Sequence, residues 1–462
     1  MTGRLRRAGG FAAVATLALA APLLETRVAP AASELPGVGA GPGGEVVIAL
    51  PFAAVALAAS TVEDGALFEL FARPGDWEAG RLYGLLGFCL AATGLGLLTA
   101  VTALPTPVFV AAVLLVGYGN LAATAAEALH ADPFARGGGF VAGGALAAVC
   151  GIVAVAVVDG ASADALVEAA PRYAFVGVSG GLLGVLLRSV LFRRDEPLVM
   201  LSVGLLSWLL WALTASDGVA VTWASIAVGL ALTAGLGYVS YALDAADVAG
   251  MVTGVLLALI TIVMGGYGWF ALLVAFYAVG SLATQFRYED KRDRGVAEDN
   301  DGARGSGNVL GNAAVAMVAV VGYAASSGDL LAVEADLFAL AFAGSLATAT
   351  SDTLSSEIGG LFDDPRLITT LEPVDPGTDG AVTWQGELAG LGGAALVAAI
   401  AVVGLGVGPV GGGVVLVGGI AGMTADSLLG ATLEGDAVGN QTVNFLATLS
   451  GAVAAAVVAA VM

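Results

Sequence analysis

Three carboxylate side chains lie near the ends of long apolar segments, where they could bind a metal ion. Asp352 and Glu357 follow the apolar run "DLFALAFAGSLATA", and Asp426 lies near the end of the apolar segment 410–431. A carboxylate beside such a segment costs free energy unless it is paired, solvated or bound to a metal. We therefore predict that all three are catalytic residues that bind Mg²⁺, a cation that prefers oxygen ligands. The alternatives are a solvated loop for Asp352 and Glu357, and a structural hydrogen bond to a neighbouring hydroxyl group for Asp426.

Amide, hydroxyl and guanidinium side chains in the same part of the sequence could bind phosphate. The strings "RGSGNVLGN" and "GNQTVNF" each open an apolar segment and place two asparagines four residues apart, on one face of a helix. Helix N-termini attract anions, and arginine binds phosphate oxygens. The predicted phosphate-binding residues are Arg304, Asn308, Asn312, Arg366, Thr369, Thr370, Asn440 and Asn444. Beside Mg²⁺ they suit phosphoryl or nucleotidyl transfer; the alternative for the asparagines is hydrogen bonding between helices.

The elements that carry these residues are typical of a membrane protein. The chain has 462 residues, of which 58% are hydrophobic and 12% charged, whereas about a quarter of a soluble protein is charged. Apolar runs of about 17–25 residues recur throughout, which is the length of a membrane-spanning helix. We predict an all-α, polytopic integral membrane protein with about fifteen transmembrane helices. They are expected near residues 8–24, 45–62, 82–103, 106–129, 138–158, 173–192, 197–214, 219–239, 248–265, 267–284, 308–327, 336–351, 386–407, 410–431 and 442–462.

The distribution of basic residues predicts the orientation of these helices. Cytoplasmic loops of membrane proteins are enriched in Lys and Arg. If the N-terminus is cytoplasmic, fourteen basic residues fall on the cytoplasmic side, and only Arg27 and Arg172 fall outside. We therefore expect a multi-pass protein of the cell membrane with its active face in the cytoplasm. The basic head and apolar run of residues 1–24 could also be a secretory signal, but we favour a retained first helix.

Charge excludes several classes of function. The net charge is −21, and Lys291 is the single lysine. Such a chain is typical of a halophilic cytoplasm, and without a basic stripe it is not expected to bind nucleic acid. His130 is the single histidine, which excludes a multi-histidine zinc site. The mixed-charge segment 285–303, which includes Lys291, is predicted to be mostly solvated linker.

The C-terminal half resembles a known family. The strings "GWFALLVAFYAVGSLAT", "RGSGNVLGN", "SDTLSSEIG", "PRLITT", "DPGTDGAVTWQGELAG", "DSLLGAT" and "NQTVNFL" are similar, in the same order, to the transmembrane protein 19 / phytyl-phosphate kinase family, also called domain of unknown function 92. The resemblance implies a prenyl-phosphate kinase-like membrane domain over residues 237–462. Residues 1–236 form a membrane region of unknown role, in which "LFELFARPGDWEAGRLYGLLGF" and "LLRSVLFRRDEP" are the most distinctive strings. Both lie at predicted cytoplasmic edges and either complete a lipid groove or serve as scaffold.

A weaker resemblance links the same motifs to dolichol and phytol kinases and to CDP-diacylglycerol synthases. It implies metal-binding roles for Asp352 and Asp426, whereas the middle motif, Thr383–Gly386, lacks the family's lysine. The resulting hypothesis is a kinase that transfers the γ-phosphate of CTP or another nucleoside triphosphate to an isoprenoid (phytyl or geranylgeranyl type) monophosphate, with Mg²⁺. One alternative is a CTP-dependent cytidylyltransferase acting on a lipid phosphate. Another is a transporter or flippase, which should show inverted repeats around a site at the membrane midplane.

Overall fold

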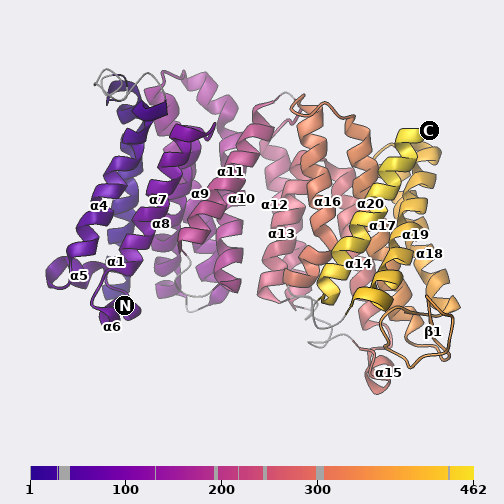
Figure 1. The fold of residues 1–462 in the computed structure, drawn as a ribbon. Helices are drawn as coiled ribbons and strands as arrows, with labels where there is room; N and C mark the ends of the chain where they lie inside the picture. The colour runs from indigo at the N-terminus through magenta and orange to yellow at the C-terminus, as the bar shows by residue number, and fades with distance from the viewer. Residues whose placement is uncertain are drawn as a thin grey trace. The chain divides into compact units, whose positions relative to one another are not determined.

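The protein is almost entirely helical, as its composition predicts (Figure 1). The computed structural model describes residues 2–28, 30, 42–130, 132–191, 196–216, 218–242, 247–297, 306–434 and 438–462. Among these residues the extended structure is one two-stranded antiparallel hairpin, β1 (Arg366–Leu367) with β2 (Ala381–Val382). The prediction of an all-α integral membrane protein is therefore confirmed.

Thirteen helices of the described residues are long and apolar enough to cross a membrane. The first, Gly3–Val28, joins α1 (Thr2–Ala15) to the short helices η1 (Thr16–Ala20), α2 (Ala21–Leu23) and η2 (Leu24–Val28). The others belong to α7 (Tyr83–Val101), α8 (Thr106–Leu129), α9 (Pro133–Val158), α10 (Ala163–Val190), α11 (Glu196–Ala215), α12 (Trp223–Ala242), α14 (Tyr267–Gln285), α16 (Ser306–Ser327), α17 (Ala335–Gly359), α18 (Trp384–Gly404), α19 (Gly408–Leu433) and α20 (Asn440–Val461).

Two further predicted segments are helical in a different way. Residues 45–62 lie in η3 (Pro42–Ala49) and α4 (Leu50–Thr61), which is followed by α5 (Gly65–Phe71) after a bend of 112°. The segment 248–265 is the shorter apolar helix α13 (Val248–Met264). Each of the fifteen predicted segments thus corresponds to a helix. The side of the membrane on which the N-terminus lies stays a prediction.

The chain forms two compact units, Met1–Thr214 (the N-terminal unit) and Ala215–Met462 (the C-terminal unit). In the N-terminal unit α8 is the most buried span and packs against α1, α9 and α10. In the C-terminal unit α17 is central and contacts α14, α16, α18, α19 and α20. This unit begins before residue 237, where the family-like motifs start, because α12 packs against α13.

Small residues bring α17, α19 and α20 into close contact. The hydroxyl group of Thr348 on α17 lies 3.0 Å from the carbonyl oxygen of Gly344 and 3.3 Å from that of Gly418 on α19. A Cβ atom added to Gly422 of α19 would lie 2.0 Å from the same hydroxyl oxygen, and one added to Gly451 of α20 would lie 1.9 Å from it. Close backbone approach of this kind is a common basis of helix packing in membranes. These glycines therefore fix the register of the three helices.

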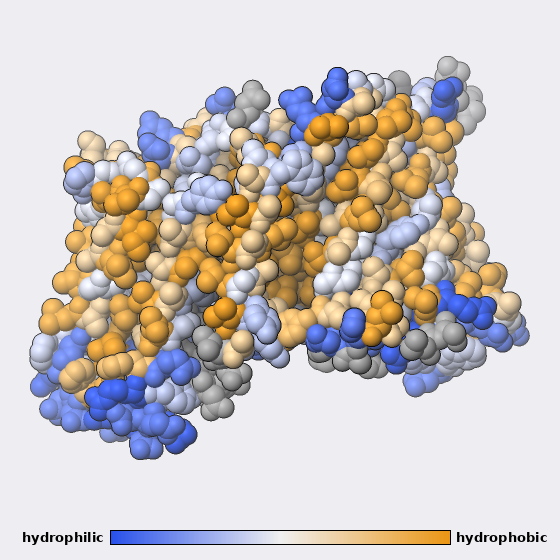
Figure 2. Space-filling model, turned by 180° about the vertical axis from the view of Figure 1, so that it is seen from behind, coloured by the Kyte–Doolittle hydropathy of each residue, from blue (hydrophilic) through white to orange (hydrophobic). Residues whose placement is uncertain are grey.

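The polar segments of the C-terminal unit gather at one end of its helices. Helices α14, α17 and α19 end there and α16, α18 and α20 begin there, next to α15 (Tyr288–Asp293) and the β1–β2 hairpin (Figure 1). Figure 2 shows hydrophilic residues concentrated at that end, with apolar side chains over the helices. Helix α17 runs to Gly359, about two turns beyond the predicted span 336–351, and ends at the two glycines of "SEIGG". Asp352 and Glu357 consequently lie inside this helix.

A buried lysine ties α14, α15 and α17 together at this end. Lys291 is 1% exposed, and its ammonium group donates hydrogen bonds to the carbonyl oxygens of Ala283 (3.0 Å) and Thr284 (2.6 Å) at the end of α14. It also forms an ion pair with Glu357 of α17, which accepts a further hydrogen bond from the Thr284 hydroxyl (2.9 Å). The last carbonyl groups of a helix have no partner within the helix and attract cations. The prediction that segment 285–303 is mostly solvated linker is therefore wrong at Lys291.

The glycine contacts predict that glycine-to-alanine substitutions at two positions of α19 differ sharply in their effect on the free energy of unfolding. In Gly418→Ala the new Cβ would lie 2.8 Å from the backbone oxygen of Gly451, which cannot move aside freely, so we expect a loss of about 1–3 kcal/mol in unfolding free energy. Gly413→Ala is the matched control, because no atom lies within 4 Å of its new Cβ. The check is the midpoint of thermal unfolding in detergent. Equal midpoints for the two variants would contradict this account of the packing.

The lysine network predicts a second contrast, between neighbouring cations. Lys291→Met leaves the Glu357 carboxylate buried without its cation, so we expect a loss of about 3–5 kcal/mol in stability. Arg292→Met is the control, because Arg292 pairs with Glu289 at the exposed surface, where a pair contributes about 0–1 kcal/mol. Replacing both Lys291 and Glu357 by apolar residues should recover part of the loss. Unfolding midpoints in the same detergent measure all three effects, and similar values for the two single variants would refute a structural role for Lys291.

Candidate functional site

The close packing of α17 and α19 brings two carboxyl groups together. On α17, Asp352 follows Thr348 by four residues, and on α19, Asp426 follows Gly422 by four. Residues four apart lie on one face of a helix, so the helices that touch at Thr348 and Gly422 also face each other one turn further on. The two aspartate carboxyl groups lie within hydrogen-bonding reach of each other. Two of the three predicted metal-binding residues, from distant parts of the sequence, therefore meet.

The aspartate pair has an unsatisfied oxygen atom. Oδ1 of Asp426 is buried and has no hydrogen-bond partner among the described residues. Glu434 lies two turns beyond Asp426 along the same face, close enough to Asp379 and Asp426 to feel their charges. The pKa of Glu434 is raised, mainly by burial and further by those two negative charges. Negative charge on Asp379 and Asp426 thus disfavours ionisation of Glu434, and a cation bound nearby would offset that charge.

The aspartate pair fits one kind of metal site better than another. Within the described ranges no group of three or more His, Cys, Asp or Glu side chains is arranged to hold a metal ion. A closed structural site, with four protein ligands, is thus not formed by these residues. Mg²⁺, however, commonly takes one or two carboxylates and fills its remaining positions with water and substrate phosphate. Asp352 and Asp426, with the unsatisfied oxygen of Asp426, fit such an open site.

Glu357 differs from the two aspartates. It is 6% exposed, and both carboxylate oxygens are engaged, one by the Lys291 ammonium group and one by the Thr284 hydroxyl. It lies five residues beyond Asp352, well around the helix from the face that contacts α19. A metal ion would have to displace the lysine to bind there. The structure thus gives Glu357 a structural role in place of the predicted role as a metal ligand.

The predicted asparagine faces lie on adjacent helices. Helices α16 and α20 pack at their N-termini, where a Cβ added to Gly311 would lie 3.1 Å from the backbone oxygen of Gln441. Asn312 is buried in α16, and Asn440 is exposed at the start of α20. Asn444 is half-buried on the face of α20 that also carries Gly451, which contacts α17. Asn308 lies in the first turn of α16.

Register places Asn444 near the level of the aspartate pair. It precedes Gly451 by seven residues, or about 10 Å along α20 at 1.5 Å per residue. On α17, Gly451 contacts Gly344 and Thr348. Asp352 lies eight residues beyond the first and four beyond the second, or about 12 Å and 6 Å along the helix. The two side chains therefore lie at a similar depth on facing helices. Of the predicted asparagines, Asn444 has the position best suited to a group bound by the aspartates.

The remaining predicted phosphate-binding residues belong to exposed segments. Arg366 is exposed in β1 and donates a hydrogen bond of 2.7 Å to the carbonyl oxygen of Leu371. Thr369 and Thr370 are exposed in the turn that follows, where the Thr370 hydroxyl accepts a hydrogen bond from the Glu372 backbone. The hydrogen bonds of Arg366 and Thr370 thus lie within this turn, and a role of these residues in binding phosphate stays a prediction. Arg304 lies outside the described residues.

The middle motif, Thr383–Gly386, is a helix cap. The Thr383 hydroxyl oxygen accepts a hydrogen bond of 3.2 Å from the Gly386 backbone at the start of α18. The same hydroxyl lies 3.4 Å from the carbonyl oxygen of Gly359 at the end of α17. Capping of this kind satisfies a backbone N–H group that has no partner within the helix. The motif thus joins the ends of α17 and α18, independently of any lysine.

Sequence reasoning missed two residues near the site. Lys291 was hidden by its mixed-charge surroundings, although it is the single lysine of the chain and follows an apolar span closely. Glu434, at the end of α19, is the second residue. A signal for it was present, because residues 418, 422, 426, 430 and 434 are Gly, Gly, Asp, Gly and Glu at a constant spacing of four. Residues four apart are neighbours on a helix, so this spacing places Asp426 beside Gly422 and Gly430 and leads to Glu434 at the helix end.

A shallow apolar groove lies on another face of α17. It has a volume of about 280 Å³ and lies between α14 and α17. Its α17 residues are Leu354 and Ile358, and Leu354 lies about 200° around the helix from Asp352. The groove is therefore an apolar surface on the far side of α17 from the aspartate pair.

Comparison with known proteins places the site in a family. The integral membrane protein DUF92 family matches residues 231–452. An uncharacterized membrane protein of Methanocaldococcus jannaschii is 35% identical over 218 residues, which are 45% of this chain and 83% of that protein. An uncharacterized membrane protein of Synechocystis sp. is 35% identical over 199 residues, 41% of this chain and 74% of that protein. No solved structure matches the chain.

A plant relative matches a shorter part. Protein VTE6, chloroplastic, of Arabidopsis thaliana is 37% identical over 149 residues, which are 31% of this chain and 42% of that protein. The family match spans most of the C-terminal unit, including Asp352, Asp426 and the starts of α16 and α20. It does not include the N-terminal unit. Through its C-terminal unit, the chain belongs to the DUF92 family of integral membrane proteins.

Proposed function

We propose that the C-terminal unit is a kinase that transfers the γ-phosphate of a nucleoside triphosphate to an isoprenoid monophosphate. The observation that carries the proposal is the meeting of Asp352 and Asp426, with a buried oxygen of Asp426 left unsatisfied. The resemblance of the surrounding motifs to the phytyl-phosphate kinase family supports the substrate class. The polar helix ends gather at one end of the unit, which favours an enzyme over a transporter with a site at the midplane.

In this proposal Asp352 and Asp426 hold Mg²⁺, and other residues orient the phosphate groups. Bound Mg²⁺ would polarise the phosphoryl oxygens and offset their negative charge. The aspartates alone would repel a phosphate, so they must act together with a cation. Asn444, at a similar depth on α20, is placed to donate hydrogen bonds to a phosphate oxygen. Arg304 and Arg366 remain candidates for binding the nucleotide phosphates, with Thr369 and Thr370 beside the latter.

The proposed reaction needs positioning more than covalent chemistry from the protein. A phosphate oxygen of the isoprenoid monophosphate attacks the γ-phosphorus of the nucleotide. The bond between that phosphorus and the bridging oxygen breaks, which yields the isoprenoid diphosphate and a nucleoside diphosphate. The apolar faces of the helices would leave the isoprenoid tail in the bilayer. We propose that this end of the unit faces the cytoplasm of a cell membrane, where nucleotides are available.

A transfer assay on the purified full-length chain tests the proposal. It uses geranylgeranyl or phytyl monophosphate, Mg²⁺, and CTP or ATP labelled at the α or the γ phosphorus. We expect label from the γ position in a lipid diphosphate. Asp352→Asn and Asp426→Asn should each reduce the rate by about a hundredfold or more, because metal-ion stabilisation of the transition state contributes several kcal/mol.

Asp375→Asn is the matched control for the transfer assay. Asp375 is an exposed carboxylate of the same polar end, so its loss should leave the rate nearly unchanged. Transfer of label from the α position would identify a cytidylyltransferase at the same carboxylates. If Asp426→Asn folds and keeps full activity, the proposed metal site is wrong. Absence of transfer from any nucleotide to any prenyl phosphate would refute the kinase.

Mg²⁺ binding can also be measured without turnover. Neutralising two adjacent carboxyl groups should stabilise the fold, so we expect Mg²⁺ to raise the unfolding midpoint of the parent chain. Asp352→Asn removes one negative charge but keeps a side chain that can hydrogen-bond to Asp426. Its midpoint without Mg²⁺ should therefore not fall, and its response to Mg²⁺ should be lost. An equal response in Asp352→Asn and Asp375→Asn would show that Mg²⁺ acts elsewhere.

A further inference from the structure

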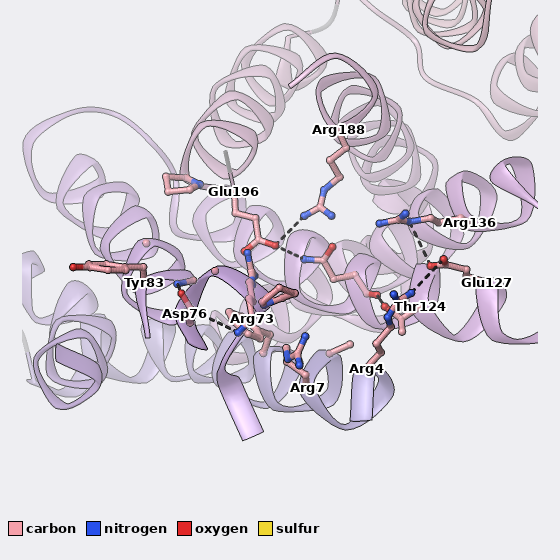
Figure 3. A pocket seen from close by; sticks show the side chains of 18 of the residues that line it. Arg4, Arg7, Arg73, Asp76, Tyr83, Thr124, Glu127, Arg136, Arg188 and Glu196 are labelled. Carbon is pink, nitrogen blue, oxygen red and sulfur yellow. Dashed lines mark hydrogen bonds and ion pairs between the residues drawn. The ribbon is translucent and has the colours of Figure 1, made fainter. Parts of the chain in front are cut away.

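The N-terminal unit contains a cavity of about 870 Å³ lined by five arginines (Figure 3). The cavity lies where α1, α7, α9 and α11 begin and α8 and α10 end, beside the short helix α6 (Pro74–Ala79). Its arginines are Arg4, Arg7, Arg73, Arg136 and Arg188. They come from three helices, α1, α9 and α10, and from the residue that precedes α6. Guanidinium groups at one end of a bundle of apolar helices mark the depth at which lipid phosphates lie.

The carboxylates of the cavity are shared between several donors. Glu196 pairs with both Arg73 (2.5 Å) and Arg188 (3.4 Å). Glu127 lies 3.8 Å from Arg4 and from Arg136, at the outer limit of an ion pair. Each of these carboxylates thus serves two guanidinium groups, and hydrogen-bonding capacity of the arginines remains unused.

The other two carboxylates that line the cavity, Asp76 and Glu78, form no ion pair with its arginines among the described residues. Asp76 is 4% exposed and accepts hydrogen bonds from the backbone nitrogens of Arg73 (3.0 Å) and Gly84 (3.2 Å). It therefore holds the backbone of this segment in place. Glu78 is exposed to solvent at the rim, and no ion pair to it is formed among the described residues.

Arg7 is the guanidinium group with the strongest need for an anion. It lies between Arg73 and Arg4 in the cavity wall (Figure 3), and in the described part of the chain no carboxylate forms an ion pair with it. Its Nε is buried, and so is Nε of Arg188; neither atom has a hydrogen-bond partner among the residues that the structure describes. A buried N–H group without an acceptor is costly, and a charged one more so. A bound anion would satisfy both donors.

Two of the arginines, Arg73 and Arg188, are held in position by aromatic rings of the cavity. Arg73 stacks on the ring of Phe11 at 4.6 Å from its centroid, and Arg188 stacks on Phe140 at 4.8 Å. A Cβ added to Gly84 would lie 2.8 Å from Cδ and Nε of Arg73, so the glycine leaves space for this side chain. Planar, oriented guanidinium groups match the geometry of phosphate oxygens.

We propose that this cavity binds the phosphate group of an anionic ligand, carried by a membrane lipid or by a small soluble phosphate. Arg7 and Arg188 donate to the phosphate oxygens through the groups that lack partners, and Arg73 and Arg136 complete the ring. Phe11 and Pro197 provide apolar surface in the same wall, which suits a headgroup whose chain continues into the bilayer. This inference does not depend on the function proposed for the C-terminal unit.

The test measures binding of two probes to the purified full-length chain without divalent cations, so that the aspartate pair cannot contribute through a metal. One probe is radiolabelled inorganic pyrophosphate, and the other is labelled phosphatidic acid in phosphatidylcholine nanodiscs. We expect saturable binding that is about tenfold to a hundredfold weaker in Arg7→Gln. Arg6→Gln is the matched control, because Arg6 is exposed on the same helix and does not line the cavity.

The two probes distinguish the sources of the phosphate. Binding of phosphatidic acid alone identifies a lipid headgroup, whereas binding of both probes identifies a site for phosphate itself. Equal weakening in Arg6→Gln and Arg7→Gln would overturn the proposal, because it would reflect general charge attraction. Failure of the parent chain to bind either probe would overturn it as well, even if Arg7→Gln does not fold. Binding should persist in Asp352→Asn, which separates this inference from the fate of the kinase proposal.

Discussion

The close contact of α17 with α19 is the constraint on which the C-terminal unit depends. Gly418 and Gly422 allow the α19 backbone to reach Thr348, and Gly451 brings α20 to the same hydroxyl group. In a bilayer, apolar side chains gain little by leaving lipid for protein, so close packing of small residues carries much of the association. The same contact sets the register in which Asp352 and Asp426 meet. The face of each helix that makes the packing contact therefore also carries its aspartate.

The three acidic residues expected at this end of the unit differ because of the groups around them. Glu357 has a buried cation and a hydroxyl group as partners, so its charge is compensated and it stabilises the fold. Asp352 and Asp426 face each other across a helix contact, with their carboxyl groups within hydrogen-bonding reach. Removing a charge should destabilise the protein at Glu357 and relieve repulsion at Asp352. Asp352 and Glu357, five residues apart on α17, thus differ in their expected effect on stability.

The sequence predicts the helices well because their length and apolar character are local properties. It also predicts that Asp352 and Asp426 belong together, through motif order, and that most arginines share one side of the membrane. It does not predict the extension of α17 to Gly359, since "SDTLSSEIG" is as polar as a loop and becomes helical by packing on its neighbours. Nor does it predict the partner of Glu357, because Lys291 reaches it from a separate short helix. Such contacts depend on tertiary register, which no local pattern encodes.

The scarcity of cations in this chain makes their placement informative. With 17 basic residues against 38 acidic ones, cations could be used simply to balance charge at the surface. Instead the single lysine is buried at the end of α14, and five arginines line one cavity. Among the described residues, the charged side chains with a buried atom that lacks a hydrogen-bond partner differ in sign between the units: Oδ1 of Asp426 in one, and Nε of Arg7 and Arg188 in the other. The proposed Mg²⁺ would supply a partner for the first, and the proposed phosphate group would supply one for the second.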